Sequence, residues 1–135
     1  MYQFYFLSVF LNGLAGLVLS SDYISEKFSG FAGIRDLING AKTKFTIGIS
    51  TFILGALKLF APVSGWLVLG DFLPAVGGLA LGFILLMDFL KQRSVMNSDM
   101  LVRIDSLVTA NKTPVGFAGI LIAVLHFFFC GTFLL

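Results

Sequence analysis

The sequence predicts an all-α integral membrane protein with four transmembrane helices. Of its 135 residues, 58% are hydrophobic and 12% are charged, and the mean hydropathy is +0.99. Soluble domains are far more polar than this. Most apolar residues fall in four stretches, each close to the ~20 residues that cross a hydrocarbon core as a helix. These stretches are Tyr2–Leu19, Phe45–Ala61, Trp66–Phe89 and Pro114–Leu135. So short a chain is expected to form one transmembrane domain over residues 1–135.

The first apolar stretch has the length of a secretory signal peptide, and two small residues, Ser20 and Ser21, follow it. A signal peptide also carries a positively charged segment before its apolar core. This chain has no lysine or arginine at that place. We therefore expect the stretch to remain in the protein as the first span.

The basic residues lie mainly in the connections between the stretches. Residues 20–44 hold four Lys or Arg residues and residues 91–113 hold another four, whereas Pro62–Gly65 has none. Lys and Arg near the ends of spans mark the cytoplasmic side. The sequence therefore predicts that both long connections are cytoplasmic and that both termini lie outside. The expected location is the inner (plasma) membrane of the cell.

Each long connection contains an amphipathic segment at helical spacing. The apolar positions are Phe31, Ile34, Ile38 and Ala41 in the first and Met100, Leu101, Ile104, Leu107 and Val108 in the second. Such segments can lie flat at the headgroup boundary of a bilayer. The alternative is that they simply extend the neighbouring spans into the cytoplasm.

A weak internal duplication relates the two halves of the chain. A shift of 68 positions places Lys44 on Lys112, at the start of the second and fourth spans. A shift of 62 positions aligns six residues of the first span with identical residues of the third: Leu7, Phe10, Leu11, Gly16, Leu17 and Leu19. We interpret residues 1–61 and 64–135 as two helical hairpins, each with an amphipathic segment between its spans. They would form a parallel repeat, with a pseudo-twofold axis along the membrane normal.

Small residues recur along the spans. Lipid gives apolar helices no hydrophobic reason to associate, so helices pack where small side chains let their backbones approach. We expect such packing within the chain, and a homo-oligomer interface is the alternative. The residues concerned are Gly16, Ser20, Gly78, Gly82, Thr51, Gly55, Gly119 and Ala123.

Several ionisable residues fall inside the spans. A charge at the centre of a transmembrane helix costs about 2.5–3.5 kcal/mol by insertion scales, so each one needs a reason. Lys58 and Asp71 flank the short outer turn and are expected to form an ion pair across it. The alternative is that Asp71 binds a cation or a proton, with Lys58 as its competitor. Asp88, which precedes Lys91 by less than one turn, is expected to be solvated or paired at its span end.

The single histidine, His126, aligns with Lys58 in the proposed repeat but lies deeper in its span. Its neutral imidazole is tolerable there if it finds a hydrogen-bond partner. Histidine also titrates near physiological pH. His126 is therefore either a packing residue or a proton relay.

No motif in the sequence indicates catalysis or metal binding. The chain has one histidine, one cysteine (Cys130), no glycine-rich phosphate loop and no Ser–His–Asp set. We expect no cofactor and no metal, and nothing argues for an enzyme. Because the basic residues flank membrane spans, a nucleic-acid partner is not expected either.

Two functions remain. The first is a helix-packing accessory or assembly component, which associates with itself or with another membrane protein and otherwise contacts lipid. The second is a small transporter or channel for ions, protons or solutes, in which His126, Asp71 and Lys58 line the route.

Overall fold

The computed structural model describes residues 2–60, 72–93 and 98–128, and every regular element within these ranges is helical. The elements are α1 (Tyr2–Lys27), the 3-10 helix η1 (Ser29–Phe31), α2 (Ala32–Ile38), α3 (Ala41–Phe60), α4 (Phe72–Gln92) and α5 (Asp99–Phe128).

Four of the described helices, α1, α3, α4 and α5, are long and apolar enough to cross a membrane. The shortest, α3, has 20 residues, which at ~1.5 Å per residue matches the ~30 Å thickness of a hydrocarbon core. The prediction of an all-helical chain with four such helices is confirmed for this part of the chain. It indicates a multi-pass membrane protein.

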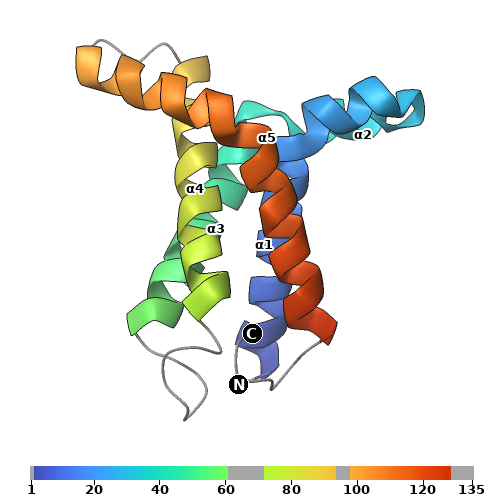
Figure 1. Cartoon of the computed structure of the whole chain (residues 1–135), viewed down its shortest axis with the longest axis vertical. Helices are drawn as coiled ribbons and strands as arrows, with labels where there is room; N and C mark the ends of the chain where they lie inside the picture. Colours follow the sequence, from blue (N-terminus) through green and yellow to red (C-terminus); the bar gives the residue numbers. More distant parts are fainter. Residues whose placement is uncertain (1, 61–71, 94–97, 129–135) are drawn as a thin grey trace.

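Two of these helices extend beyond the predicted spans. Helix α1 continues eight residues past Leu19, and α5 begins fifteen residues before Pro114. The second amphipathic segment is therefore the first half of α5 and is continuous with the fourth span. Pro114 removes one helical hydrogen bond inside α5, and the helix bends near this point (Figure 1).

The first amphipathic segment is divided differently from the prediction. It comprises η1 and α2, and the chain then turns at Asn39 and Gly40. Ala41, which was expected to belong to this segment, instead starts α3.

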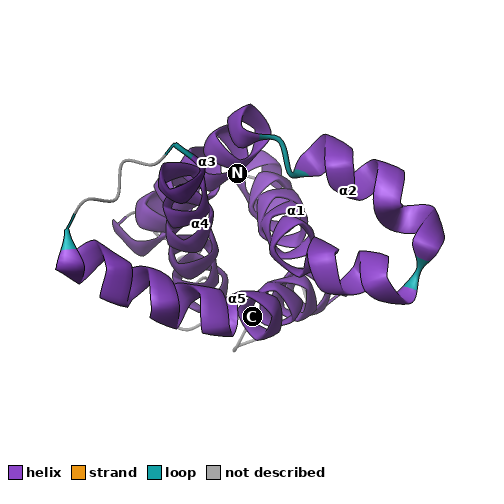
Figure 2. Ribbon diagram, turned by 90° about the horizontal axis from the view of Figure 1, so that it is seen from above, coloured by secondary structure: helices purple, strands orange, loops and turns teal. Residues whose placement is uncertain are grey.

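The helices pack in two pairs. Helix α3 packs mainly against α4, and α1 mainly against α5 (Figures 1 and 2). The pairs meet through smaller interfaces of α1 with α3 and α4, and of α4 with α5. The most extensive contacts therefore join helices from different predicted repeat units.

One end of the bundle carries every described Lys, Arg, Asp and Glu residue except Lys58. This is the end at which α1 leads into η1 and α5 bends, at the top of Figure 1. We call it the polar end. Near it, buried apolar side chains form the core of the bundle: Ala15, Val18, Leu19, Ile47, Leu81, Ile84, Leu85, Met87 and Val108.

Large apolar side chains also cover the outside of the described helices. Phe10 on α1 is 64% exposed and Phe60 on α3 is 85% exposed. Extensive apolar surface of this kind is unfavourable in water. It is the surface that a hydrocarbon core would solvate.

Candidate functional site

The interface between α3 and α4 is built on glycines of both helices. A Cβ atom added at Gly82 would lie 2.6 Å from the backbone nitrogen of Phe52 and 2.8 Å from the carbonyl oxygen of Gly48. One added at Gly55 would lie 2.8 Å from the carbonyl oxygen of Ala75. Side chains do not tolerate such distances, so the two backbones approach each other only because these positions are glycine.

The interface between α1 and α5 has the same character over a shorter length. A Cβ atom added at Gly16 would lie 2.5 Å from the carbonyl oxygen of Gly116. One added at Gly116 would lie 2.9 Å from the backbone nitrogen of Ser20. The Ser20 hydroxyl donates a hydrogen bond to the Gly16 carbonyl within α1, at 2.8 Å, and so needs no partner on α5.

The remaining predicted packing residues also face other helices of the same chain. A Cβ atom added at Gly78 would lie 3.3 Å from the carbonyl oxygen of Thr51, and one at Gly119 would meet the Leu81 side chain of α4 at 2.6 Å. Ala123 is buried and faces Gly13 of α1. All eight small residues named from the sequence are therefore engaged inside the chain.

The predicted intramembrane polar site is placed only in part. Lys58 on α3 and His126 on α5 are both buried, at 4% and 3% exposure, near the end of the bundle opposite the polar end. They belong to different helix pairs. Asp71, the third predicted member, lies outside the described residues, so the expected Lys58–Asp71 ion pair does too.

Tyr5 on α1 lies against His126. Its hydroxyl donates a hydrogen bond to the backbone carbonyl oxygen of His126, and the two rings lie 4.6 Å apart, centroid to centroid. This contact fixes the N-terminal end of α1 against the C-terminal end of α5. Nothing in the sequence links the two residues, which are 121 positions apart.

The best-defined polar constellation was not predicted from the sequence. At the polar end, Lys44 Nζ lies 3.1 Å and Lys112 Nζ lies 2.9 Å from the same oxygen, Oδ2 of Asp88. All three side chains are largely buried, with at most 16% exposure. Asp88 thus pairs with lysines of α3 and α5, and not with its sequence neighbour Lys91, whose ammonium lies 3.0 Å from Asp105.

The constellation continues onto α1 and α2. Lys112 Nζ is also 3.5 Å from Oδ2 of Asp22, whose Oδ1 accepts a hydrogen bond from Arg35 Nε at 2.8 Å. This hydrogen bond and the charge of Asp22 raise the pKa of Arg35 above its ordinary value, so the guanidinium stays charged. We call Lys44, Asp88, Lys112, Asp22 and Arg35 the ionic chain. It links all five α-helices through side-chain contacts.

Three further buried polar side chains of the bundle, Asn12, Thr51 and Ser21, are bonded within their own helix or to a neighbouring one. Buried Asn12 on α1 donates from Nδ2 to the carbonyl oxygen of Pro74 on α4, at 3.0 Å. The Thr51 and Ser21 hydroxyls donate to carbonyl oxygens of their own helices. Among the described residues, no three His, Cys, Asp or Glu side chains are close enough to hold a metal ion.

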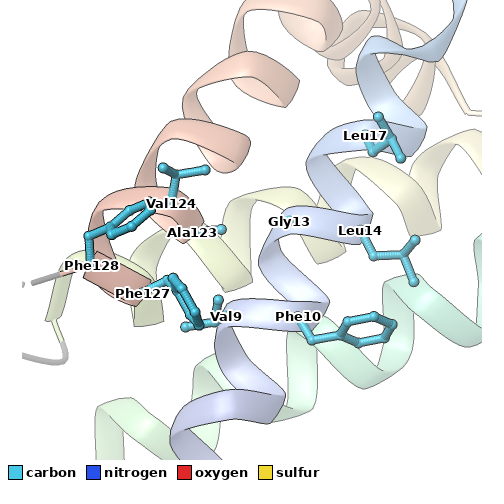
Figure 3. Close-up of a pocket in the computed structure, with 9 residues that line it drawn as sticks. All are labelled: Val9, Phe10, Gly13, Leu14, Leu17, Ala123, Val124, Phe127 and Phe128. Atoms are coloured by element: carbon cyan, nitrogen blue, oxygen red, sulfur yellow. The ribbon is translucent and has the colours of Figure 1, made fainter. Parts of the chain in front are cut away.

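An apolar groove runs along the outer side of the α1–α5 pair (Figure 3). It has a volume of about 380 Å³, and Gly13 and Ala123 lie between its bulkier walls. The complete lining is Val9, Phe10, Gly13, Leu14, Leu17, Ala123, Val124, Phe127 and Phe128. Every one of these side chains is apolar, so the groove suits hydrocarbon and offers nothing to a polar substrate.

Neither a curated protein nor a solved structure matches the chain. The model of an uncharacterised protein family matches residues 1–126, which include every described helix apart from the last two residues of α5. The chain belongs to this uncharacterised family.

Proposed function

We propose that the protein is a non-catalytic, multi-pass component of the inner (plasma) membrane that assembles laterally with a second copy or with another membrane protein. The groove on α1 and α5 carries this proposal. It is concave, wholly apolar and lies on the outer side of a helix pair, so it matches the side chains of a neighbouring transmembrane helix.

The state of the polar side chains supports a packing role. Asp88 and Asn12 are bonded to groups of neighbouring helices, and Thr51 to its own helix. Polar groups bonded in this way stabilise a bundle and leave few sites for a passing ion or a substrate. The small residues also favour a packing role, because they face helices of the same chain and hold the monomer together. The groove, which shares only Ala123 with this set, is then the candidate surface for contact with another protein.

The ionic chain supports the proposed two-unit architecture. Lys44 and Lys112, which the 68-residue shift aligns, approach the same carboxylate from α3 and from α5. The exchanged helix pairs, α3 with α4 and α1 with α5, are what a pseudo-twofold axis between units 1–61 and 64–135 would generate. With the positive-inside rule, the polar end would face the cytoplasm.

Site-specific photocrosslinking in native membranes tests lateral assembly. A benzophenone side chain at Val124, in the groove, is compared with one at Leu57, which has similar exposure on α3 outside it. We expect protein adducts from position 124 and mainly lipid adducts from position 57. Gly13→Leu, which fills the groove floor, should remove the adduct. Equal adducts from both positions, or adducts that survive Gly13→Leu, would contradict the proposal.

Transport is the second candidate, and the burial of Lys58 and His126 within apolar helices favours it. Buried ionisable side chains in spans commonly mark ion or proton pathways. Proteoliposome flux of protons and monovalent cations should then fall in His126→Ala and Asp71→Asn relative to the parent protein. Background flux in the parent protein would eliminate this candidate and leave the assembly proposal standing.

A further inference from the structure

Two helical arms leave the bundle at the polar end. The first arm, residues 21–38, comprises the end of α1 with η1 and α2. The second arm, residues 99–113, is the half of α5 before Pro114. They extend to opposite sides of the bundle and across its long axis (Figures 1 and 2). If the four long helices cross a bilayer, both arms lie at the surface of the same leaflet.

Both arms expose large apolar side chains. Phe28 and Leu37 on the first arm and Met100 and Leu107 on the second are each at least 67% exposed. Leu107 and Met100 lie seven residues apart, on one face of the second arm. Arms of this kind are poorly suited to water and well suited to the boundary between headgroups and acyl chains.

The polar end also has cations without carboxylate partners. Within the described part of the chain, Lys27, Lys42, Arg93 and Arg103 form no ion pair, and all four are exposed. Two of them lie over aromatic rings at i, i+4 spacing. Lys27 Nζ is 5.8 Å from the ring centroid of Tyr23, and Arg93 Cζ is 5.2 Å from that of Phe89.

These cations are not needed to neutralise the carboxylates of the ionic chain. Asp88 already pairs with Lys44 and Lys112, and Asp22 pairs with Arg35 and Lys112. Only Glu26 and Asp99 are unpaired acids in the described part of the polar end. Four exposed cations against two exposed acids leave a positive surface. A positive surface with embedded apolar side chains is complementary to an anionic leaflet.

We propose that the two arms, together with the adjoining ends of α3 and α4 at the polar end, form an interfacial platform that binds anionic phospholipid. Phe28, Leu37, Met100 and Leu107 would enter the acyl boundary on either side of the bundle. Lys27, Lys42, Arg93 and Arg103 would pair with lipid headgroups of the same leaflet. The platform does not depend on lateral assembly, because the groove lies on the transmembrane part of α1 and α5.

Lipid retention by the full-length protein tests the headgroup interaction. The protein is purified with an equimolar mixture of phosphatidylglycerol and phosphatidylcholine of identical acyl chains, and retained lipid is counted by native mass spectrometry. We expect a preference for phosphatidylglycerol. Lys42→Gln with Arg103→Gln should lower that preference, by at most about fivefold for each cation removed.

The matched control removes two charges of the opposite sign from the same end. Glu26→Gln with Asp99→Asn should leave the phosphatidylglycerol preference unchanged or raise it. Equal retention of both lipids by the parent protein would overturn the proposal. So would the same loss of preference in the control and in the cation variant, because the effect would then not depend on positive charge.

Fluorescence quenching tests the depth of the arms separately. In a Trp66→Phe background, Phe28→Trp and Leu107→Trp report on the two arms, and Asp36→Trp reports on an exposed polar position of α2. We expect quenching by brominated acyl chains at positions 28 and 107 and quenching by aqueous acrylamide at position 36. Acrylamide quenching as strong at 28 and 107 as at 36 would show that the arms lie in water.

Discussion

In both the α3–α4 pair and the α1–α5 pair, the helix backbones approach each other at glycines. The two pairs differ in the length of this close contact and in the features that adjoin it. In α3–α4, glycines of both helices meet at two levels, around Gly55 and around Gly82. In α1–α5, the closest backbone approach occurs at one level, around Gly16 and Gly116. Only the second pair continues into arms and carries the described apolar groove.

The difference suggests a division between a packing half and an interacting half. The α3–α4 helices are of nearly equal length, 20 and 21 residues, and are joined along most of it. The α1–α5 helices have 26 and 30 residues, and their additional length forms the arms. Between the pairs lie a few polar contacts, chiefly Asp88 with Lys112 and Asn12 with Pro74.

The largest effect is expected where one carboxylate serves both pairs. Asp88→Asn leaves Lys44 without its described counter-charge and Lys112 with only the more distant Asp22. Removing one partner of a buried ion pair costs about 3–5 kcal/mol, because the remaining charge is left uncompensated. We expect a loss of this size in the free energy of unfolding, measured by denaturant titration in detergent micelles.

An exposed carboxylate of the same end provides the control for Asp88. Asp36 pairs with Arg35 at 3.4 Å and is 77% exposed, so Asp36→Asn should change stability by less than about 1 kcal/mol. Adding Lys44→Met to Asp88→Asn should recover part of the lost stability. Similar losses for Asp88→Asn and Asp36→Asn would mean that the ionic chain is solvated and does not join the helix pairs.

The existence of the four helices could be predicted from the sequence because their apolar character is a local property. Their ends could not be placed as well. The hydropathy of α5 falls before Pro114, yet the helix continues back to Asp99, because Leu101, Ile104 and Val108 pack on or beside the core. Amphipathic segments and helical extensions have the same period, and only tertiary contact distinguishes them.

The ionic chain could be predicted from the sequence only in part. The alignment of Lys44 with Lys112 was visible in the internal duplication, but nothing local connected either lysine with Asp88. The sequence predicted that Asp88 is solvated or paired but did not name its partners, which are Lys44 and Lys112. Its sequence neighbour Lys91 pairs with Asp105 on α5 instead. Long-range pairing depends on which helices are neighbours, and the sequence alone did not reveal the α3–α4 and α1–α5 pairs.

A medium effect is expected from the glycines that distinguish the two pairs. Gly82→Ala places a methyl group within 2.8 Å of backbone atoms of α3, which cannot move aside independently. Overpacking of this kind costs about 1–3 kcal/mol. Gly77→Ala is the control on the same helix, because its methyl group would meet only the flexible Ile122 side chain, at 3.3 Å. We expect a lower Tm in detergent for Gly82→Ala and little change for Gly77→Ala.

Gly16→Ala extends the same measurement to the α1–α5 pair. Its methyl group would lie 2.5 Å from the Gly116 carbonyl oxygen, so a similar loss of stability is expected. Because α1 and α5 meet closely at a single level, they can separate there with less disturbance than α3 and α4. A greater loss for Gly16→Ala than for Gly82→Ala would reverse the assignment of α3–α4 as the packing half.

The smallest effect is expected at the neutral contact between the pairs. Asn12→Ala removes the hydrogen bond from α1 to the Pro74 carbonyl oxygen of α4. Side-chain hydrogen bonds between transmembrane helices contribute about 0.6 kcal/mol on average and at most about 1.7 kcal/mol. Asn111→Ala, which removes an exposed bond within α5, is the control and should be nearly neutral in the same unfolding titration. If Asn12→Ala destabilises the protein as much as Gly82→Ala, the two pairs depend on each other as strongly as their own helices do. The bundle would then unfold as one unit, and the distinction between a packing half and an interacting half would have no energetic basis.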